Sequence, residues 1–295
     1  MLRNLLLNKQ HKLLNKMFNL NKSSELTQRV IVGFLGGVGM LGAIYYGVWT
    51  YFILFLIISV ATILEFYQLL RLESHLPLRT YGTCLGILIY CLTFFIELDI
   101  IEMKWLYLVF LGFSSAYLIK LYNKKDDKPF KNLAYTFLGV MYVAVPYSMI
   151  HAYVFFDTKY HYEILIGAML ILWANDSGAY FSGKTFGRRK LFERVSPKKT
   201  WEGSIGGAAL GVTVSLIFSH FYTSLEAWRW VTIAIIIVVT GTYGDLVESL
   251  FKRSMSIKDS GKTLPGHGGF LDRFDGLLLS APFIAAFLKL FPPNL

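Results

Sequence analysis

Residues 229–248 read RWVTIAIIIVVTGTYGDLVE. From Trp230 to Gly244 this stretch carries no charged side chain, and its length suits a helix that crosses the roughly 30 Å hydrocarbon core of a bilayer. Two carboxylates, Asp245 and Glu248, stand at its carboxyl end. Acidic residues in membrane spans are costly and mark functional sites by default. The stretch therefore predicts a membrane protein whose chemistry lies at one end of its spans.

The rest of the sequence repeats this pattern of long apolar runs. The chain is 55% hydrophobic, its mean hydropathy is +0.49, and 16% of its residues are charged, against about 25% in soluble domains. The runs predict an all-α polytopic membrane protein with about nine transmembrane helices. We expect the spans at 30–47, 51–70, 81–98, 104–121, 133–156, 162–181, 203–221, 229–248 and 274–292.

The positive charges predict an orientation for these spans. The net charge of +10 would suggest nucleic-acid binding in a soluble protein. Here 25 of the 29 Lys and Arg residues fall on the same side when nine spans are threaded through the membrane. Basic loops face the cytoplasm. We therefore expect no nucleic-acid partner, a cytoplasmic N-terminus, an outside C-terminus, and a location in the cell (inner or plasma) membrane.

The chain divides into three regions on this reading. Residues 1–29 are a cytoplasmic or interfacial segment, with leucines that could form a short amphipathic helix on the inner leaflet. Residues 30–170 hold the N-terminal transmembrane helices. Residues 171–295 form a catalytic transmembrane region with two basic cytoplasmic loops.

Carboxylates gather at the cytoplasmic ends of the predicted spans. Asp245 and Glu248 are three residues apart, on one face of a helix, and Asp272 and Asp275 repeat that spacing at the start of the last span. Grouped oxygen ligands suit Mg²⁺, which shares its coordination shell with water and phosphates. The alternative is that these carboxylates form salt bridges with nearby cations. For Glu65, a salt bridge and a metal-binding role are equally favoured. The six carboxylates at this depth are Glu65, Asp176, Asp245, Glu248, Asp272 and Asp275.

The loop at residues 249–273 reads SLFKRSMSIKDSGKTLPGHGGFLDR. Glycine-rich backbone beside Lys and Arg can cradle phosphates. Glycines on both sides of His267 allow a positive φ and close approach to a ligand. The simpler alternative, cations that hold anionic lipid headgroups, does not explain the carboxylates among them. The loop therefore predicts a metal–polyphosphate site.

The loop at residues 182–202 supplies further cations. Ser196 and Pro197 suggest the N-cap and first turn of a helix, whose N-terminus would favour an anion. Lys198 and Lys199 follow directly. Nearby, residues 178–185 (GAYFSGKT) fit the P-loop pattern letter for letter. That pattern requires a strand before it and a helix after it, and here its first half lies in a predicted span, so we expect no P-loop.

These motifs resemble the phosphatidate cytidylyltransferase family. Residues 249–275 match its signature without a departure, and residues 196–203 (SPKKTWEG) and 244–249 (GDLVES) are also similar. The resemblance is specific over residues 170–275, is limited to hydropathy over 30–170, and is absent from 1–29.

The resemblance implies a reaction in which CTP and phosphatidic acid give CDP-diacylglycerol and pyrophosphate, with Mg²⁺ alone or with a second cation. It also implies that the protein forms a homodimer and has membrane lipids as partners. The catalytic residues expected are Asp245, Asp272, Lys252, Arg253, Lys258, Asp259, His267 and Arg273. Those expected to bind substrate are Asp176, Ser196, Lys198, Lys199, Thr200, Gly268 and Gly269, and those expected to hold metal are Asp245, Asp272, Glu248 and Asp275.

Two other functions fit part of the pattern. A CTP-dependent polyprenol or lipid kinase would share the architecture but transfer the γ-phosphate, and the full signature at 249–275 argues against it. An ion-coupled transporter would explain carboxylates within spans. Transporter sites lie near the bilayer midplane between repeats, whereas here the charges gather at one face and no repeat is visible.

Overall fold

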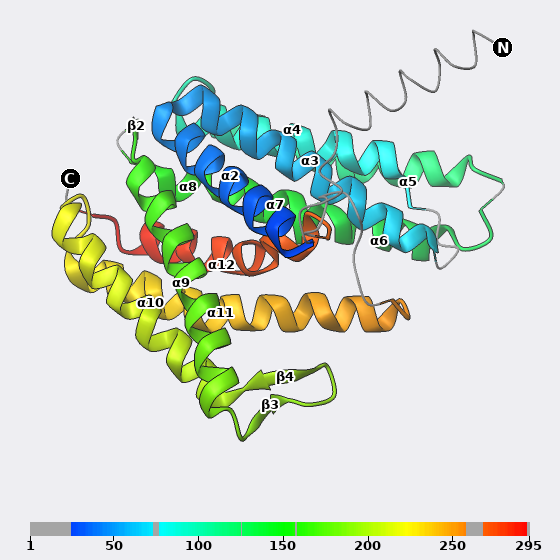
Figure 1. The fold of residues 1–295 in the computed structure, drawn as a ribbon. Helices are drawn as coiled ribbons and strands as arrows, with labels where there is room; N and C mark the ends of the chain where they lie inside the picture. Colours follow the sequence, from blue (N-terminus) through cyan, green and yellow to red (C-terminus); the bar gives the residue numbers. More distant parts are fainter. Residues whose placement is uncertain (1–24, 73–76, 125, 157, 258–267, 294–295) are drawn as a thin grey trace, which may run out of the picture.

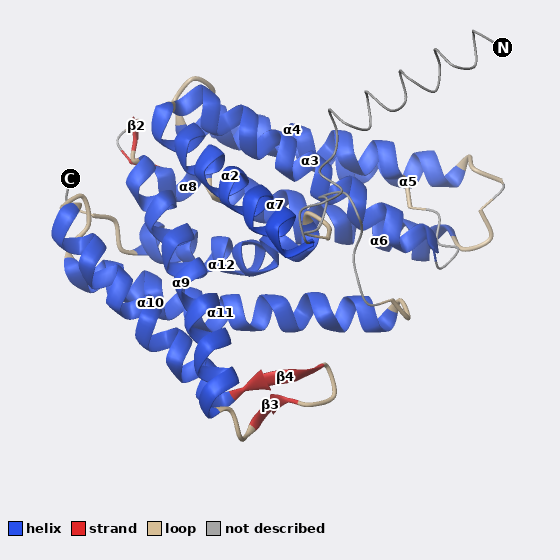
Figure 2. Ribbon diagram, viewed as in Figure 1, coloured by secondary structure: helices blue, strands red, loops and turns tan. Residues whose placement is uncertain are grey.

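The computed structural model describes residues 25–72, 77–124, 126–156, 158–257 and 268–293. Most of them are helical, and the helices pack into one bundle (Figures 1 and 2). The helices of the first half are α2 (Glu25–Tyr46), α3 (Val48–Leu72), α4 (Arg79–Glu97), the 3₁₀ turn η2 (Met103–Leu106), α5 (Tyr107–Leu121), α6 (Pro129–Gly139), the π-helical segment η3 (Val140–Ala144), α7 (Val145–Met149) and α8 (His151–Val154). Those of the second half are α9 (Tyr162–Phe186), α10 (Trp201–Phe221), α11 (Ala227–Ser254) and α12 (Leu271–Leu290).

The helices are those of an integral membrane protein. Within the described ranges, seven helical segments are long and apolar enough to cross a membrane. They contain α3, α4, α5 with η2, α6 through α8, α9, α10 and α11. The first and last predicted spans coincide with α2 and α12. The described apolar part of α2 is only Gly33–Tyr46, and α12 carries four charged residues, so neither meets the same criterion.

Two short hairpins interrupt the all-α pattern. One pairs β1 (Phe155–Phe156) with β2 (Lys159–Tyr160), and the other pairs β3 (Lys190–Phe192) with β4 (Ser196–Thr200). The helix start predicted at Ser196 is therefore wrong. Ser196 pairs with Phe192 instead, and α10 begins at Trp201, where the Thr200 Oγ1 accepts a hydrogen bond of 3.2 Å from the Gly203 N–H. Hydrogen bonding between β3 and β4 outweighs the local preference of Ser196 and Pro197 for the start of a helix.

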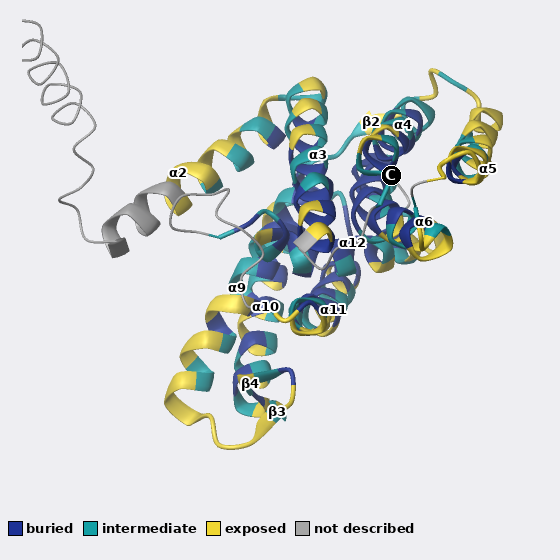
Figure 3. Ribbon diagram, turned by 90° about the vertical axis from the view of Figure 1, so that its right-hand side faces the viewer, coloured by how far each residue is buried: buried dark blue, intermediate teal, exposed yellow. Residues whose placement is uncertain are grey.

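The surface is apolar where lipid would cover it. Exposed residues are numerous on α2 and α5 (Figure 3) and on α10. Large apolar side chains there, such as Phe110, Leu111, Ile217 and Phe221, are more than half exposed. Because lipid tails solvate such side chains, this surface agrees with a polytopic membrane protein.

The centre of the bundle holds α12, which packs closely against α11. Gly244 of α11 faces the Asp275 carbonyl of α12, and a Cβ at this position would lie 2.6 Å from that oxygen. Small residues at a membrane helix interface allow such close approach of two backbones. This contact brings the carboxyl end of α11 beside the first turns of α12.

Candidate active site

A cavity of about 720 Å³ opens between α9, α10, β4, α11 and α12. Its volume lies in the range of ligand pockets, about 300–1,000 Å³. On α9 the lining residues recur at helical spacing, from Leu172 to Lys184. The cavity is lined by Leu172, Trp173, Asn175, Asp176, Ala179, Tyr180, Gly183, Lys184, Ser196, Lys198, Lys199, Thr200, Gly203, Ser204, Gly241, Thr242, Asp245, Glu248, Lys252, Asp272, Arg273, Asp275 and Gly276.

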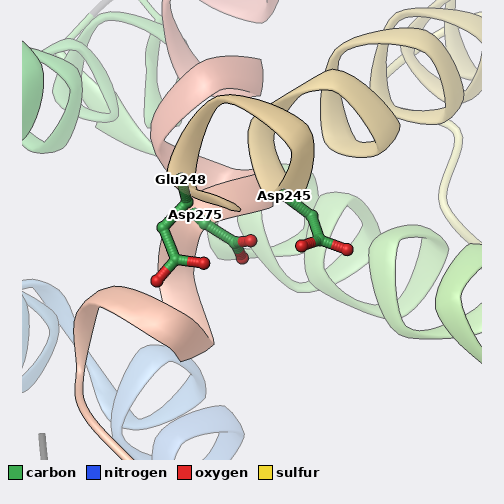
Figure 4. A group of neighbouring side chains, drawn as sticks. All are labelled: Asp245, Glu248 and Asp275. Atoms are coloured by element: carbon green, nitrogen blue, oxygen red, sulfur yellow. The ribbon is translucent and has the colours of Figure 1, made fainter. Parts of the chain in front are cut away.

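Three carboxylates meet in the wall of this cavity. Asp245 and Glu248 project from α11 and Asp275 from α12, side by side (Figure 4). Ligand oxygens of the three lie within 4.8 Å of one another. Asp245 is partly open to the cavity, whereas Glu248 is almost fully buried. Like charges at this separation repel, so a cation between them would be strongly favoured.

Asp272, the fourth predicted metal ligand, lies next to this group and is engaged differently. The Lys252 Nζ donates to Asp272 Oδ1 over 2.7 Å and lies 2.9 Å from Glu248 Oε2. Lys252 thus joins α11 to the first turn of α12. The backbone N–H of Gly269 also approaches Asp272 Oδ2 at 3.4 Å.

Strand β4 of the hairpin contributes two lysines, Lys198 and Lys199, to the cavity. The Lys199 Nζ lies 2.8 Å from Asp245 Oδ2 and donates to the Thr242 carbonyl over 3.0 Å. Lys198 is exposed at the cavity and makes no ion pair within the described part of the chain. The hairpin base is fixed by Glu202, whose carboxylate accepts the Arg188 N–H at 3.1 Å. The cavity therefore combines a group of carboxylates with lysine ammonium groups.

Most of the predicted site residues lie together in this cavity. Arg253 is an exception, because it is exposed on the last turn of α11 and does not line the cavity. Gly268 and Gly269 lie just before α12, and Gly268 has the positive φ, +84°, that the glycine-rich run predicted. Lys258, Asp259 and His267 lie outside the described residues.

The predicted site residues did not include several polar residues of the cavity or the partner of one buried carboxylate. Asn175, Lys184 and Thr242 line the cavity. Lys184 could have been found from its spacing, two helical turns after Asp176. Glu65 of α3 is buried and accepts backbone N–H groups at the start of α12. No local pattern could have indicated that contact, because the partners are 205 and 206 residues away.

The residues present fit a hard divalent cation. Glu248 Oε1 is buried and has no hydrogen-bond partner among the described residues, and a buried carboxylate oxygen left in this state is costly. A cation held by Asp245, Glu248 and Asp275 would satisfy it. Mg²⁺ and Ca²⁺ are the ions that prefer such all-oxygen ligands.

The sequence of the chain matches that of a known protein family. A sequence model described as the cytidylyltransferase family matches residues 27–291, which is most of the chain and includes every element that builds the cavity. The chain belongs to the cytidylyltransferase family.

Curated members of related sequence carry a more specific name. A phosphatidate cytidylyltransferase of Haemophilus influenzae is 43% identical over 129 residues, covering 42% of this chain and 45% of that protein. Phosphatidate cytidylyltransferases of Staphylococcus haemolyticus and Staphylococcus aureus are each 38% identical, over 161 and 164 residues, covering 54% of this chain and 60% of theirs. The chain thus spans about half the length of the curated relatives it matches.

Residues 178–185 of this member of the cytidylyltransferase family match the P-loop pattern but do not form a P-loop, as predicted. Residues 178–185 lie inside α9, which continues without a break to Phe186. A phosphate-binding P-loop needs a loop between a strand and a helix. Gly183 and Lys184 line the cavity from a helix face instead.

Proposed function

We propose that the protein is a phosphatidate cytidylyltransferase, which converts CTP and phosphatidic acid to CDP-diacylglycerol and pyrophosphate. One observation carries this proposal: carboxylates of α11 and α12 and lysines of β4 and α11 line a single cavity in a membrane protein of the cytidylyltransferase family. Phosphoryl and nucleotidyl transfer depend on positioning and on neutralising phosphate charge. Carboxylates that hold a metal and ammonium groups that bind phosphates supply both.

The reaction we propose is an in-line displacement at the α-phosphorus of CTP. A phosphate oxygen of phosphatidic acid forms the new P–O bond, while the bond from the α-phosphorus to the bridging oxygen of the β-phosphate breaks. Pyrophosphate leaves with the electron pair. Because the phosphate of the lipid is already ionised near neutral pH, the step needs no general base.

The residues of the chain take distinct roles in this proposal. Asp245, Glu248 and Asp275 would hold Mg²⁺, which would supply positive charge to neutralise phosphate oxygens. Lys198 and Lys199 clamp the triphosphate from the hairpin. Asp272 fixes Lys252, and its place among the metal ligands stays a prediction. Further contacts to the phosphates or their charged neighbours are proposed for Asp176, Ser196, Thr200, Arg253, Lys258, Asp259, His267, Gly268, Gly269 and Arg273.

The proposal extends to the arrangement in the membrane. The distribution of Lys and Arg supports nine spans with a cytoplasmic N-terminus and an outside C-terminus in the cell membrane. The cavity would then face the cytoplasm, where a soluble nucleotide can meet a lipid of the inner leaflet. We also propose a homodimer, and a division into the segments 1–29, 30–170 and 171–295 with the last as the catalytic region.

The test uses purified protein in detergent with phosphatidic acid, Mg²⁺ and CTP labelled separately at the α- and γ-phosphates. We expect the α-label in the lipid fraction and the γ-label in pyrophosphate. Entry of the γ-label into a supplied polyprenol would support a kinase instead. If neither label moves while a known phosphatidate cytidylyltransferase works in the same assay, the proposal is wrong and ion-coupled transport becomes the next measurement.

A further inference from the structure

The first turn of α12 lacks a cap from its own sequence neighbourhood. Its N-cap residue, Phe270, makes no side-chain capping bond. The first N–H groups of a helix have no partner within the helix, so a buried helix start needs acceptors from elsewhere. Leu271 and Phe274 in this turn are buried. An acceptor from another part of the chain is therefore required.

Glu65 of α3 supplies that acceptor. Its Oε2 accepts the Phe270 N–H at 2.9 Å and its Oε1 accepts the Leu271 N–H at 3.2 Å. The residue is only 5% exposed. A carboxylate at a helix N-terminus also interacts favourably with the helix dipole. Both oxygens of Glu65 are thus directed at the start of one helix that belongs to the other half of the chain.

The turn that Glu65 holds carries two residues of the cavity, Asp272 and Asp275. Asp275 meets Asp245 and Glu248 of α11, and Asp272 bonds to Lys252 of α11. Glu65 does not line the cavity. Its hydrogen bonds to the Phe270 and Leu271 N–H groups instead reach the carboxylate group through the backbone to which Asp272 and Asp275 are attached.

We propose that Glu65 is a positioning residue, which fixes the first turn of α12 so that Asp275 joins Asp245 and Glu248 in one metal-binding group. The kinetic part of this inference rests on the proposed cytidylyltransferase function, whereas the metal-binding part does not. Partners that orient metal ligands change metal affinity or activity by about 10- to 100-fold when they are removed. The effect of Glu65 should fall in the same range.

The experiment compares the full-length wild type with Glu65→Gln, Glu65→Asp and Thr62→Val in detergent. The amide of Glu65→Gln keeps one acceptor and loses the charge, while Glu65→Asp keeps the carboxylate on a shorter side chain. Thr62→Val is the matched control, because it removes a buried hydroxyl of α3 whose bonds go to the Ile58 carbonyl and the Tyr147 hydroxyl, not to α12. The readouts are Mn²⁺ affinity by electron paramagnetic resonance, kcat, KM for CTP, and thermal unfolding.

We expect Glu65→Gln to weaken Mn²⁺ binding and lower kcat by about tenfold or more, with KM for CTP changed less at saturating metal. Glu65→Asp should recover part of both losses, and Thr62→Val should keep both within about twofold of wild type. If Glu65→Gln keeps wild-type Mn²⁺ affinity and kcat and only unfolds at a lower temperature, the inference is overturned. If the wild type makes no CDP-diacylglycerol but loses Mn²⁺ affinity on Glu65→Gln, the inference stands and the proposed function fails.

Discussion

The two halves of the chain, α2–α8 and α9–α12, bury their residues in different ways. Of the largest fully buried side chains among the described residues, all but Trp230 belong to the first half or to β1 beside it; examples are Tyr51, Tyr67 and Tyr90. Every residue that lines the large cavity belongs to the second half. The first half therefore builds a core rich in aromatic side chains. The second half leaves a partly polar cavity between helices that approach each other closely at glycines.

This difference suggests how a membrane enzyme can combine stability with a charged site. Aromatic packing contributes much buried area per residue, so the first half can contribute a large share of the stability of the bundle. The second half can then keep Asp245, Glu248 and Asp275 near one another at an electrostatic cost. Changes in the two halves should accordingly affect different measurements.

The largest effect is expected for the carboxylates of the second half. Asp245→Asn and Asp275→Asn keep the side-chain volume and remove a metal-binding charge, so kcat should fall by at least about 100-fold. The midpoint of thermal unfolding should change little, because the repulsion between neighbouring carboxylates is also relieved. Labelled-CTP turnover and differential scanning fluorimetry measure the two quantities. The control is Glu102→Gln, which removes an exposed ion pair with Lys104 and does not line the cavity. Near wild-type turnover in Asp245→Asn and Asp275→Asn would contradict the proposed site.

An intermediate effect is expected where α11 and α12 touch. In Gly244→Ala the new methyl group would lie 2.6 Å from the Asp275 carbonyl oxygen, so the two helices must separate. Overpacking of this kind costs about 1–3 kcal/mol, and the shift of Asp275 should lower kcat by about tenfold. Both stability and turnover should therefore fall.

The matched control is Gly211→Ala, also in the second half. There the added methyl group meets its nearest neighbour, a methyl group of Val238, at 3.4 Å, which is ordinary packing. We expect turnover within about twofold of wild type, since the site is not displaced. If Gly244→Ala and Gly211→Ala lowered turnover equally, the α11–α12 contact would not be what positions the carboxylates.

The smallest effect on turnover is expected in the first half, at Asp126 between α5 and α6. Burial raises the pKa of this carboxyl group, but hydrogen bonds from Lys120, the Lys128 N–H at 3.0 Å and Asn132 at 2.7 Å outweigh it, and the pKa is lowered. The group therefore adds stability above the usual Asp pKa of about 3.9, and this stability is lost as the pH falls through the lowered value.

Asp126→Asn should lower the unfolding temperature at pH 7 while kcat stays within about twofold of wild type. The difference in unfolding temperature should shrink as the pH is lowered below about 4, where the wild-type carboxyl group also becomes protonated. Unfolding scans between pH 3 and pH 7 measure this. A difference that does not depend on pH would mean that packing, rather than the charge of Asp126, is responsible.

Much of the candidate site was predictable because its residues share one feature of the sequence. Asp176, Asp245 and Asp272 each stand near the same end of a predicted span, and all three line one cavity. Which carboxylates lie close enough together to bind one cation was not predictable. In the sequence Asp272 and Asp245 are equivalent candidates for metal ligands, but in the structure Asp272 bonds to Lys252, and Asp275 lies with Asp245 and Glu248 instead.

The sequence by itself determined the membrane class, the approximate positions of the spans and the end of the bundle that carries the charges. These follow from the lengths of apolar runs and from the side on which Lys and Arg fall, which are local properties. Only the tertiary structure decided that residues 196–200 form a strand, that Glu65 holds the start of α12, and that Asp275 meets Asp245 and Glu248. The contacts of Glu65 and Asp275 depend on partners far along the chain, and helix packing sets such distances, which no local pattern encodes. The strand at 196–200 depends on pairing with residues 190–192, which outweighs the local preference for a helix start.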